Sequence, residues 1–416
     1  MNFAIVNLGC KVNRVESDSF AAALIARGAV EVPEAQADLI VVNTCTVTGE
    51  AEKKARKAVR RALRANDRAT VAVTGCAVAI DADAYRAMDA RVRTMGKAEL
   101  LAAIEGDAWG ASAQHGEALP VGGAFRTRVG VKVQDGCDNA CTYCIVHVAR
   151  GRATSRPAAD VVAECAALAR AGVREIVLTG INLGSYCDGA GRRDPQAVRL
   201  PALLRQLLAA TAAEHAPGEP PCRFRISSIE PRDVAPELIE LLAEADGRIC
   251  RHLHLPLQSG SSKVLREMAR PYDAERFCAL VERIRARVPQ ISLSTDVIVG
   301  FPGETEDDFA ATCAVARRCG FSKLHVFPYS QRAGTPAAAR ADQVPPAVKA
   351  DRAARLRALG DELRAQDCER RMGSVERALV EEGGAAMIES YYEITAPAGA
   401  AAGTLVPVRL EPALFL

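Results

Sequence analysis

Three cysteines stand close together in the stretch DGCDNACTYC, where Cys137, Cys141 and Cys144 are spaced as C-x3-C-x2-C. Three thiolates at this spacing can bind one metal centre. A structural zinc ion takes four ligands, and no Cys or His at a useful spacing completes the set, the nearest being His147. An iron–sulfur cubane bound by three cysteines leaves one iron open to a small molecule. The motif therefore favours such a cluster, with a zinc knuckle or a chance grouping as the alternative.

A second set of three cysteines is spread over the amino-terminal part of the chain. Cys10 ends the run AIVNLGC, Cys45 ends LIVVNTC and Cys76 ends TVAVTGC. Each run is short and apolar, which is typical of a buried strand. If the three strands lie side by side in a parallel sheet, their carboxyl ends share one edge and the thiols converge there. We therefore expect a second three-cysteine site, and the alternative is three buried, inert cysteines.

The elements that must position these cysteines form two α/β regions and a small β region. Residues 1–106 alternate strands and helices, which predicts a parallel-sheet α/β domain. Residues 107–124 are rich in Gly and Ala and are expected to be a linker. Residues 125–371 hold six further strand–helix repeats, which fits a partial, TIM-like (β/α)6 barrel. Residues 372–416 alternate apolar and polar residues, so we expect a small β module. Strands are predicted near 3–8, 38–43, 70–75, 129–134, 174–179, 223–228, 251–255, 291–298 and 322–327.

The composition excludes several classes of protein. The chain has 416 residues, of which 49% are hydrophobic and 25% charged, as in a globular protein of two or three domains. No basic region precedes an apolar run at the amino terminus, so no signal peptide is expected. No run approaches the roughly 20 apolar residues that span a bilayer. We therefore expect a cytoplasmic protein without a membrane partner, in a compartment that keeps cysteines reduced.

DGCDNACTYC resembles the signature loop of radical S-adenosylmethionine (SAM) enzymes. The resemblance implies that the open iron binds the amino and carboxylate groups of SAM, and that reduction of the cluster cleaves SAM to a 5′-deoxyadenosyl radical. Active-site groups in barrels of this kind lie on the loops after the strands. The SAM contacts that the resemblance implies are Tyr143, Gly180, Asn182, Ser228, Gln258, Gly300 and Glu304.

Each of these contacts has an ordinary alternative. Tyr143 would lie beside the adenine, or else belong to the core. The small and polar residues at the strand ends can serve turns alone. His252 and His254 alternate along a predicted strand, and such histidines are more often core or loop-edge residues than ligands. No catalytic residue is assigned beyond the cluster ligands.

Two open-iron clusters in one chain narrow the resemblance to the methylthiotransferases, which the chain matches from Asn7 to about Ala354. That family joins an amino-terminal cluster domain to a radical SAM barrel and a small TRAM-like β module. The resemblance implies two 4Fe–4S clusters, SAM, an external electron donor and a sulfur donor that the sequence does not identify. The reaction it implies is the insertion of a methylthio group at an inert C–H bond.

Three stretches indicate the substrate. LGCKVNRVESD, DGCDNACTYC and SSIEP look most like the branch that modifies carbon 2 of N6-threonylcarbamoyladenosine at position 37 of tRNA. The isopentenyladenosine branch has Gln and Met after the first cysteine, and the branch that acts on a ribosomal protein has Pro and Lys. Lys11 and Val12 match neither, and His147 replaces a proline common in the family. The alternatives are another tRNA adenosine, a ribosomal protein side chain, or a non-enzymatic iron–sulfur protein that binds RNA or senses redox state.

A row of basic residues supports tRNA as the partner. Lys53, Lys57, Arg60 and Arg64 fall on one face of a predicted helix, where they can bind phosphates or simply face solvent. The carboxyl-terminal module has six acidic residues against two arginines from residue 373 onward. Its net charge of −4 repels phosphate, so RNA binding by this module is not predicted. Its adjacent tyrosines, Tyr391 and Tyr392, are expected to pack on a core rather than stack on bases.

Overall fold

The computed structural model describes residues 1–46, 48–106, 127–191, 194–215 and 220–416. The chain divides into two compact units. The first comprises Met1–Arg126, Asp135–Asn139 and Cys144–Ala153, and the second comprises Thr127–Gln134, Ala140–Tyr143 and Thr154–Leu416. Both units mix strands and helices, and the predicted α/β fold class is confirmed. The expected linker at 107–124 lies outside the described residues, and the predicted domain boundaries stay predictions.

The first unit is a parallel sheet with helices on both faces. Its strand order is β2-β1-β3-β4-β5. The strands are β1 (Asn2–Asn7), β2 (Val30–Glu31), β3 (Leu39–Thr44), β4 (Thr70–Gly75) and β5 (Val92–Thr94). The helices are α1 (Lys11–Ala26), α2 (Gly49–Ala65), α3 (Cys76–Ile80), α4 (Ala82–Arg86), α5 (Lys97–Glu105) and α6 (Val146–Arg150). β1, β3 and β4 coincide with the predicted strands to within one residue at each end.

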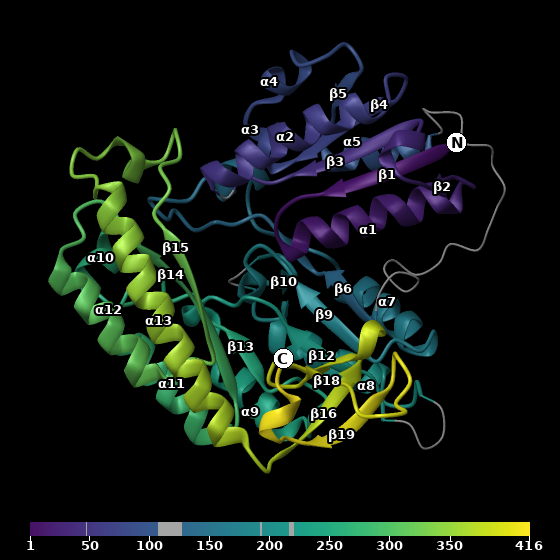
Figure 1. Cartoon of the computed structure of the whole chain (residues 1–416). Helices are drawn as coiled ribbons and strands as arrows, with labels where there is room; N and C mark the ends of the chain where they lie inside the picture. Colours follow the sequence, from purple (N-terminus) through teal and green to yellow (C-terminus); the bar gives the residue numbers. More distant parts are fainter. Residues whose placement is uncertain (47, 107–126, 192–193, 216–219) are drawn as a thin grey trace. The chain divides into compact units, whose positions relative to one another are not determined.

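The central strand β3 explains why this sheet is covered on both sides. Every residue of β3 is buried, as expected for an inner strand of a parallel sheet. Because side chains alternate along a strand, Val42 packs with Val59 of α2, whereas Val41 packs with Leu24 of α1. Figure 1 shows α1 and α2 on opposite faces of the sheet.

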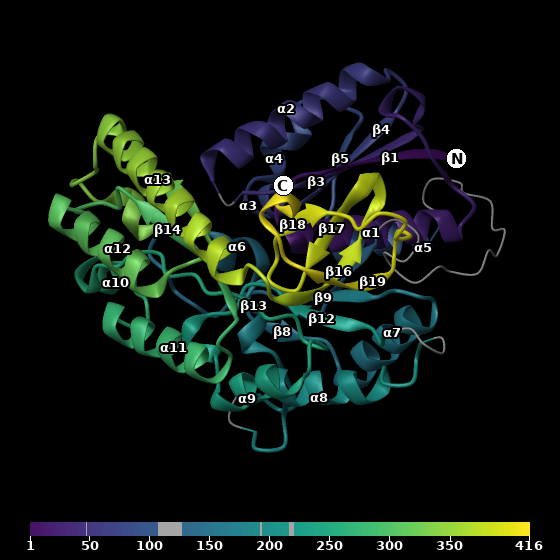
Figure 2. The same ribbon diagram turned by 60° about the horizontal axis from the view of Figure 1, so that its bottom comes forward.

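The second unit contains six parallel strands in the order β6-β9-β12-β13-β14-β15. Two three-stranded sheets, β12-β9-β6 and β13-β14-β15, are joined by parallel bridges between Phe224 and Ile249 and between Ser228 and His254. Figure 2 shows helices in an arc outside these strands, which is the arrangement of the predicted partial barrel. The strands are β6 (Arg128–Lys132), β9 (Glu175–Thr179), β12 (Arg223–Ile226), β13 (His252–His254), β14 (Ser292–Val299) and β15 (Lys323–Pro328).

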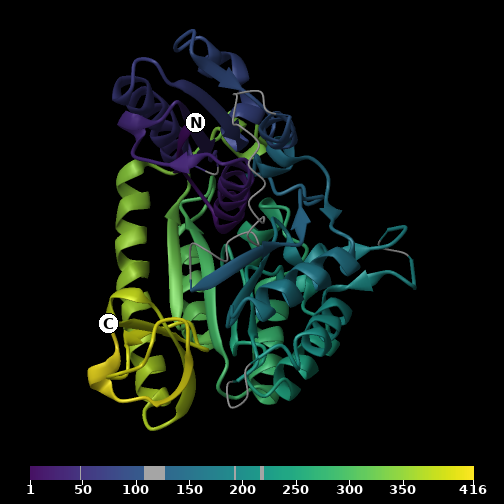
Figure 3. The same cartoon turned by 90° about the vertical axis from the view of Figure 1, so that its right-hand side faces the viewer.

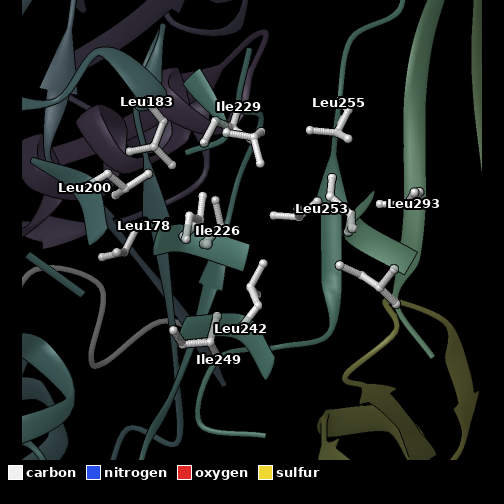
Figure 4. Close-up of a cluster of buried hydrophobic side chains, with 14 of the residues drawn as sticks. Leu178, Leu183, Leu200, Ile226, Ile229, Leu242, Ile249, Leu253, Leu255 and Leu293 are labelled. Carbon is white, nitrogen blue, oxygen red and sulfur yellow. The ribbon is translucent and has the colours of Figure 1, made fainter. Parts of the chain in front are cut away.

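The core of the barrel lies between the strands and the helices. Leu178, Ile226, Leu253 and Leu293 come from four consecutive strands and are fully buried or nearly so (Figure 4). Their neighbours along each strand therefore point to the opposite, concave face. The principal covering helices are α7 (Ala158–Arg170), α8 (Leu200–Ala210), α9 (Pro236–Glu244), α11 (Ala274–Arg287), α12 (Glu306–Cys319) and α13 (Pro346–Arg371), with the short α10 (Ser262–Glu267) after β13.

The carboxyl-terminal residues form an antiparallel sheet at the end of α13 (Figure 3). Its strands, in the order β18-β17-β16-β19, are β16 (Val375–Val380), β17 (Ala385–Ile388), β18 (Glu393–Thr395) and β19 (Leu405–Arg409). Tyr392 is buried in its core and its hydroxyl donates to Asp367 at 2.8 Å. The Tyr391 ring lies 4.6 Å from the Arg225 guanidinium of the barrel. The expectation that these tyrosines pack within the fold is therefore met.

Two buried arginines fasten this sheet to the barrel. Arg223 donates to the carbonyls of Arg377 at 2.6 Å and Met387 at 2.9 Å. Arg225 donates to the carbonyls of Glu389 at 2.9 Å and of the residue before it. Both guanidinium groups also contact the fully buried carboxylate of Glu175. Burial alone would raise the pKa of Glu175, but the two arginines outweigh burial and hold that pKa well below its usual value.

No helix in the described ranges is both long enough and apolar enough to cross a membrane.

Candidate metal centres and cofactor site

The sheet of the first unit brings Cys10, Cys45 and Cys76 to one edge. In the register of β3 and β4, Thr44 pairs with Gly75, so the next residues, Cys45 and Cys76, leave adjacent strands side by side. β1 is the other neighbour of β3, and its pairing continues through the bond from Leu8 N to Asn43 O at 2.9 Å. Cys10 follows two residues later. Because the three adjacent strands are parallel, their carboxyl ends share one edge of the sheet. The cysteines that follow them therefore lie at that edge, as the sequence pattern predicts.

Two glycines let the backbone pass close to Cys45 and to Thr44, the residue before it. Gly9 has φ +110°, and a Cβ at this position would lie 2.8 Å from Cys45 Sγ. Gly75 has φ +96°, and a Cβ there would lie 2.3 Å from the Thr44 carbonyl oxygen. No larger side chain fits at either position without moving the backbone. The segment that carries Cys10 therefore passes directly against the Cys45 thiol.

Asn13 ties the loops of this edge together. The side chain is fully buried, and its Nδ2 donates to Leu8 O at 2.9 Å and to Thr44 O at 2.8 Å. The Cys10 thiol lies 3.7 Å from its Oδ1, as a weak donor. One amide thus fixes the backbone on which both Cys10 and Cys45 depend.

Arg150 of α6 lies against the third cysteine. Its Nε donates to Cys76 Sγ at 3.2 Å, and its terminal nitrogens donate to Glu16 at 2.8 Å, Asp135 at 3.0 Å and Asn13 Oδ1 at 2.6 Å. The side chain is 3% exposed. Burial alone would lower the pKa of the guanidinium, but the neighbouring thiol and two carboxylates outweigh burial and raise that pKa. Arg150 is therefore a fixed positive charge.

The surroundings of this triad fit an anionic iron–sulfur cluster. A cavity of about 420 Å³ lies beside Cys76, the one member of the triad among its lining residues, and Arg150, Lys97 and Asp135 also line it. Within the described residues, the three thiols of Cys10, Cys45 and Cys76 do not all lie within 4.8 Å of one another. A single ion requires a closer set of ligand atoms, whereas a four-iron cubane holds its cysteines farther apart. The donor set and the buried cation therefore suit a cluster better than zinc.

The second triad lies in the loop between β7 (Gln134–Asp135) and α6. Backbone amides donate to two of its sulfurs, Asn139 N to Cys137 Sγ and Val146 N to Cys144 Sγ, both at 3.4 Å. Cys137 N is itself bound to the carbonyl of Gly151 at 3.0 Å. Hydrogen bonds to sulfur stabilise a thiolate and tune the potential of a cluster bound to it.

A buried arginine also contacts this triad. Arg270 donates from a terminal nitrogen to Cys141 Sγ at 3.2 Å and from Nε to the Tyr272 hydroxyl at 3.0 Å, and it pairs with Glu230. Burial opposes its charge, but the surrounding tyrosines, Glu230 and Cys141 raise the pKa of its guanidinium. Each triad therefore has one sulfur bonded to a buried arginine. Sequence reasoning missed both arginines, because nothing in their local patterns distinguishes them from surface residues.

The polar residues predicted to contact SAM lie at the carboxyl ends of consecutive barrel strands. Gly180 and Asn182 follow β9, Ser228 follows β12, Gln258 follows β13 and Gly300 follows β14. The short bridges from Ser228 to His254 and from Gln258 to Val297 join these ends.

Asn182 is the member of this group whose buried side chain leaves both polar atoms available to a ligand. Its side chain is 4% exposed, and among the described residues neither its Oδ1 nor its Nδ2 has a hydrogen-bond partner. Its backbone N–H donates to Gln134 Oε1 at 2.8 Å, which fixes the residue in place. A buried, unsatisfied amide is rare in native folds. This side chain therefore fits a site for a polar small molecule such as SAM.

Glu304 and Tyr143 have partners within the fold. The Glu304 carboxylate accepts from Gly300 N at 2.9 Å and from Arg352 at 2.7 Å, so it holds the turn after β14. Burial is the main reason that the pKa of Glu304 is raised. Tyr143 is half-buried and packs on an apolar cluster that includes Phe301. That position agrees with the core alternative and leaves its proposed adenine contact a prediction.

The basic row occupies the exposed face of α2. Lys53, Lys57, Arg60 and Arg64 are all exposed, whereas the opposite face, including Val59, is buried. Within the part of the chain that the structure describes, none of the four makes an ion pair. Four unneutralised charges on one helix face suit a phosphate-rich partner.

Two family models match the chain. One is the radical SAM superfamily, over residues 131–316, and the other is described as uncharacterized protein family UPF0004, over residues 2–95. Among solved structures, the radical SAM methyltransferase TsrM of Kitasatospora setae is 17% identical, with a TM-score of 0.54, over 81% of this chain and 77% of that chain. At this identity the similarity supports the fold alone.

Curated relatives match over most of their length. The threonylcarbamoyladenosine tRNA methylthiotransferase MtaB of Bacillus subtilis is 39% identical over 86% of this chain and 80% of its own. MtaB of Chlamydia pneumoniae is 36% identical over 98% and 95%. The tRNA-2-methylthio-N(6)-dimethylallyladenosine synthase of Carboxydothermus hydrogenoformans is 35% identical over 91% and 88%. With these identities and this coverage, the chain belongs to the radical SAM methylthiotransferase family.

Proposed function

We propose that this enzyme adds a methylthio group to carbon 2 of N6-threonylcarbamoyladenosine at position 37 of tRNA. The observation that carries the proposal is the 39% identity to a relative named for this substrate, over most of both chains. As a radical SAM enzyme it uses SAM and an iron–sulfur cluster. Its action on tRNA implies a cytoplasmic location, and reduction of the cluster that cleaves SAM implies an external electron donor.

The two cysteine triads are proposed to hold two 4Fe–4S clusters. Cys137, Cys141 and Cys144 would hold the cluster that binds SAM, and Cys10, Cys45 and Cys76 would hold the auxiliary cluster. When bound, these groups supply the radical abstraction of an inert hydrogen and the delivery of sulfur. The parallel register of β3 and β4 supports the second assignment, because it brings Cys45 beside Cys76.

The protein's own side chains bind, orient and shield these groups. Arg150 and Arg270 each donate an N–H to one sulfur, at 3.2 Å in both cases. The unsatisfied amide of Asn182 supports a polar contact to SAM at the end of β9. Ser228, Gln258 and the turn at Gly300 would line the same end of the barrel. The buried Glu304 holds that turn in shape.

The tRNA is proposed to bind in part through α2. The exposed, unpaired row of Lys53, Lys57, Arg60 and Arg64 provides four positive charges, and each contact to phosphate adds affinity that falls with salt. The carboxyl-terminal sheet, with its net charge of −4, adds no such attraction.

A second candidate substrate is N6-dimethylallyladenosine at the same kind of site in tRNA. It is favoured by relatives that are named for this nucleoside and are 34% to 35% identical to the chain. Lys11 and Val12 after the first cysteine support the threonylcarbamoyl substrate instead.

Mass spectrometry of tRNA nucleosides tests the proposal. A strain that lacks the protein should lose 2-methylthio-N6-threonylcarbamoyladenosine and regain it when the wild-type gene returns. A Cys45→Ala gene should not restore it, whereas Cys165→Ala, which alters a buried cysteine of α7 outside both triads, should. Loss of the dimethylallyl derivative instead would establish the second candidate. Unchanged levels of both methylthio nucleosides would exclude a tRNA substrate and favour the ribosomal or non-enzymatic alternatives.

A further inference from the structure

Three side chains on neighbouring barrel strands form a cluster that includes none of the six cysteines of the two triads. They are His254 of β13, Asp296 of β14 and His325 of β15, and their candidate ligand atoms all lie within 4.8 Å of one another. In the described part of the chain, this is the one group of three or more His, Cys, Asp or Glu side chains that meets this distance. We infer that these residues form a binding site for one divalent metal ion.

The three residues face the concave side of the barrel. In β13 and β14, the neighbours Leu253 and Leu293 are fully buried against the helices (Figure 4). Since side chains alternate across a strand, His254 and Asp296 must point the other way. All three members of the cluster are partly exposed, and Phe327, two residues after His325 on the same face, is 42% exposed. The cluster is therefore accessible to an ion and to a further ligand.

The strand register, and not chance side-chain rotation, brings the ligands together. β14 pairs with β13 and β15 on its two sides, and Asp296 is the direct partner of His325. His254 pairs with Ser294, two residues before Asp296 on the same face of β14. The cluster thus rests on three paired strands rather than on loops, as precise metal sites require.

The distances suit a first-row ion. His254 Nε2 lies 3.3 Å from Asp296 Oδ1. Two ligands bound to one ion at about 2.1 Å each are separated by roughly 3 to 3.5 Å when their bonds are about 90° to 110° apart. The His254 and His325 ring centroids are 5.6 Å apart and tilted by 55°. The candidate ligand nitrogen of His325 lies within 4.8 Å of the ligand atoms of the other two residues.

A serine orients the first histidine. Ser294 Oγ lies 2.9 Å from His254 Nδ1, and also 3.0 Å from His252 Nε2. A hydrogen bond at Nδ1 leaves Nε2 as the nitrogen directed at Asp296, and metal-binding histidines are commonly fixed through their second nitrogen in this way. A simple His–Asp ion pair of the barrel wall would need neither this support nor a second imidazole.

The donor set predicts the type of ion and leaves coordination positions open. Two imidazoles and one carboxylate suit Mn²⁺, Fe²⁺, Co²⁺ or Zn²⁺ and leave positions on one side of the ion for other ligands. On the proposed function, the substrate nucleoside carries a free carboxylate on its threonyl group. A metal-bound carboxylate at this site would hold that group and would distinguish it from an uncharged dimethylallyl group. This second step rests on the proposed function, whereas the metal site does not.

Binding of Mn²⁺ to the reconstituted full-length enzyme tests the site. Mn²⁺ is suitable because it prefers carboxylate and imidazole to thiolate, and the sharp six-line EPR signal of the free ion loses most of its amplitude on binding. The wild type should bind one equivalent. His325→Gln and Asp296→Asn should weaken that binding at least tenfold, while His215→Gln, a change outside the cluster, should not. No binding by the wild type, or equal binding by all four proteins, would overturn the inference.

Binding of the free nucleoside tests the carboxylate contact. With Mn²⁺ present, N6-threonylcarbamoyladenosine should bind at least tenfold more tightly than its carboxyl methyl ester, and the difference should disappear in His325→Gln. Equal binding of nucleoside and ester by the wild type would refute the contact while leaving the metal site intact. A nucleoside preference that persists without Mn²⁺ and survives chelation would mean that the protein binds the carboxylate directly. Failure of the proposed function would appear separately, as unchanged methylthio nucleosides in cellular tRNA.

Discussion

Arg150 Nε donates a hydrogen bond to Cys76 Sγ at 3.2 Å, and the same guanidinium is bound to Glu16, Asp135 and Asn13. Arg270 makes the equivalent contact to Cys141, also at 3.2 Å. A positive charge that is held against a cluster ligand stabilises the reduced, more negative state of the cluster. The two arginines therefore give each proposed cluster its own electrostatic support.

Replacing Arg150 should make the auxiliary cluster harder to reduce. Arg150→Met removes a charged hydrogen bond worth about 1.5 to 3 kcal/mol. If the reduced state of the cluster loses about 1.4 kcal/mol more than the oxidised state, the midpoint potential of the cluster falls by about 60 mV for a one-electron step. An EPR-monitored redox titration measures this. Arg14→Met, which removes a half-exposed arginine paired with Asp18 on α1, is the matched control. An unchanged potential in Arg150→Met with full iron content would contradict the argument.

Removing the amino-terminal triad should distinguish the roles of the two proposed clusters. With Cys10, Cys45 and Cys76 all changed to Ala, iron content should fall from about eight to about four per chain. Cleavage of SAM to 5′-deoxyadenosine under dithionite should persist, because the loop at 137–144 is untouched, while methylthiolation should be lost. Iron and sulfide analysis and product chromatography check both results. About four irons in the wild type would contradict the two-cluster assignment.

Asn182 should matter for SAM and not for stability. Its buried amide is unsatisfied in the fold, and an unsatisfied buried polar group costs stability. Asn182→Leu should therefore leave the melting temperature unchanged or raise it slightly, while it weakens SAM binding roughly tenfold. Thermal unfolding and equilibrium dialysis with SAM measure the two effects. Unchanged SAM affinity in a folded variant would remove Asn182 from the site.

Glu175 should make the free energy of unfolding decrease as the pH falls into the acid range. Its pKa is held below the usual value of the unfolded chain by Arg225 and Arg223, so the stabilisation is fully present above pH 4.5 and is lost as the pH falls below it. At neutral pH Glu175→Gln should be less stable by about 3 kcal/mol, because both buried arginines lose their counter-charge. The difference from the wild type should narrow below pH 4.5. Urea unfolding from pH 7 to pH 3 measures it, and Glu237→Gln on the exposed face of α9 is the control.

The basic row of α2 should contribute to the salt dependence of tRNA binding. Changing all four residues to Ala should reduce the slope of log affinity against log salt by about 3, if each contacts one phosphate. Filter binding between 50 and 300 mM salt measures the slope. A control with the same change in charge replaces exposed arginines on other helices, namely Arg205, Arg276, Arg283 and Arg357. An equal loss in both variants would show a general charge effect.

Strands with a continuous apolar run were predictable, and very short ones were not. β3 and β4 read as buried strands because four or more apolar or small residues stand between polar boundaries. β2 has two exposed residues and β5 has three residues, so neither has a pattern to detect. Both are edge strands that owe their place to pairing with an inner neighbour. These two strands form because of tertiary contacts, which the local sequence does not encode.

Some residues of the candidate sites were likewise predictable from the sequence, and others were not. The cysteine triads were predictable because their spacing, or their repeated place at strand ends, is visible in one dimension. Arg150 and Arg270 were not, since their sulfur partners lie 74 and 129 residues away in the chain. His254, Asp296 and His325 each look ordinary alone. Only the register of three strands shows that they meet.

The attachment of the carboxyl-terminal sheet has a consequence for how this family can diversify. Arg223 and Arg225 bind main-chain carbonyls of β16, of β17 and of the residue that follows β17. Main-chain oxygens are present whatever the side chain, so the joint tolerates substitution on the sheet it holds. Side chains on the outer surface of this small sheet can therefore change, to acidic residues or to residues that suit a different partner. The hydrogen bonds that attach the sheet to the barrel are not affected by such changes.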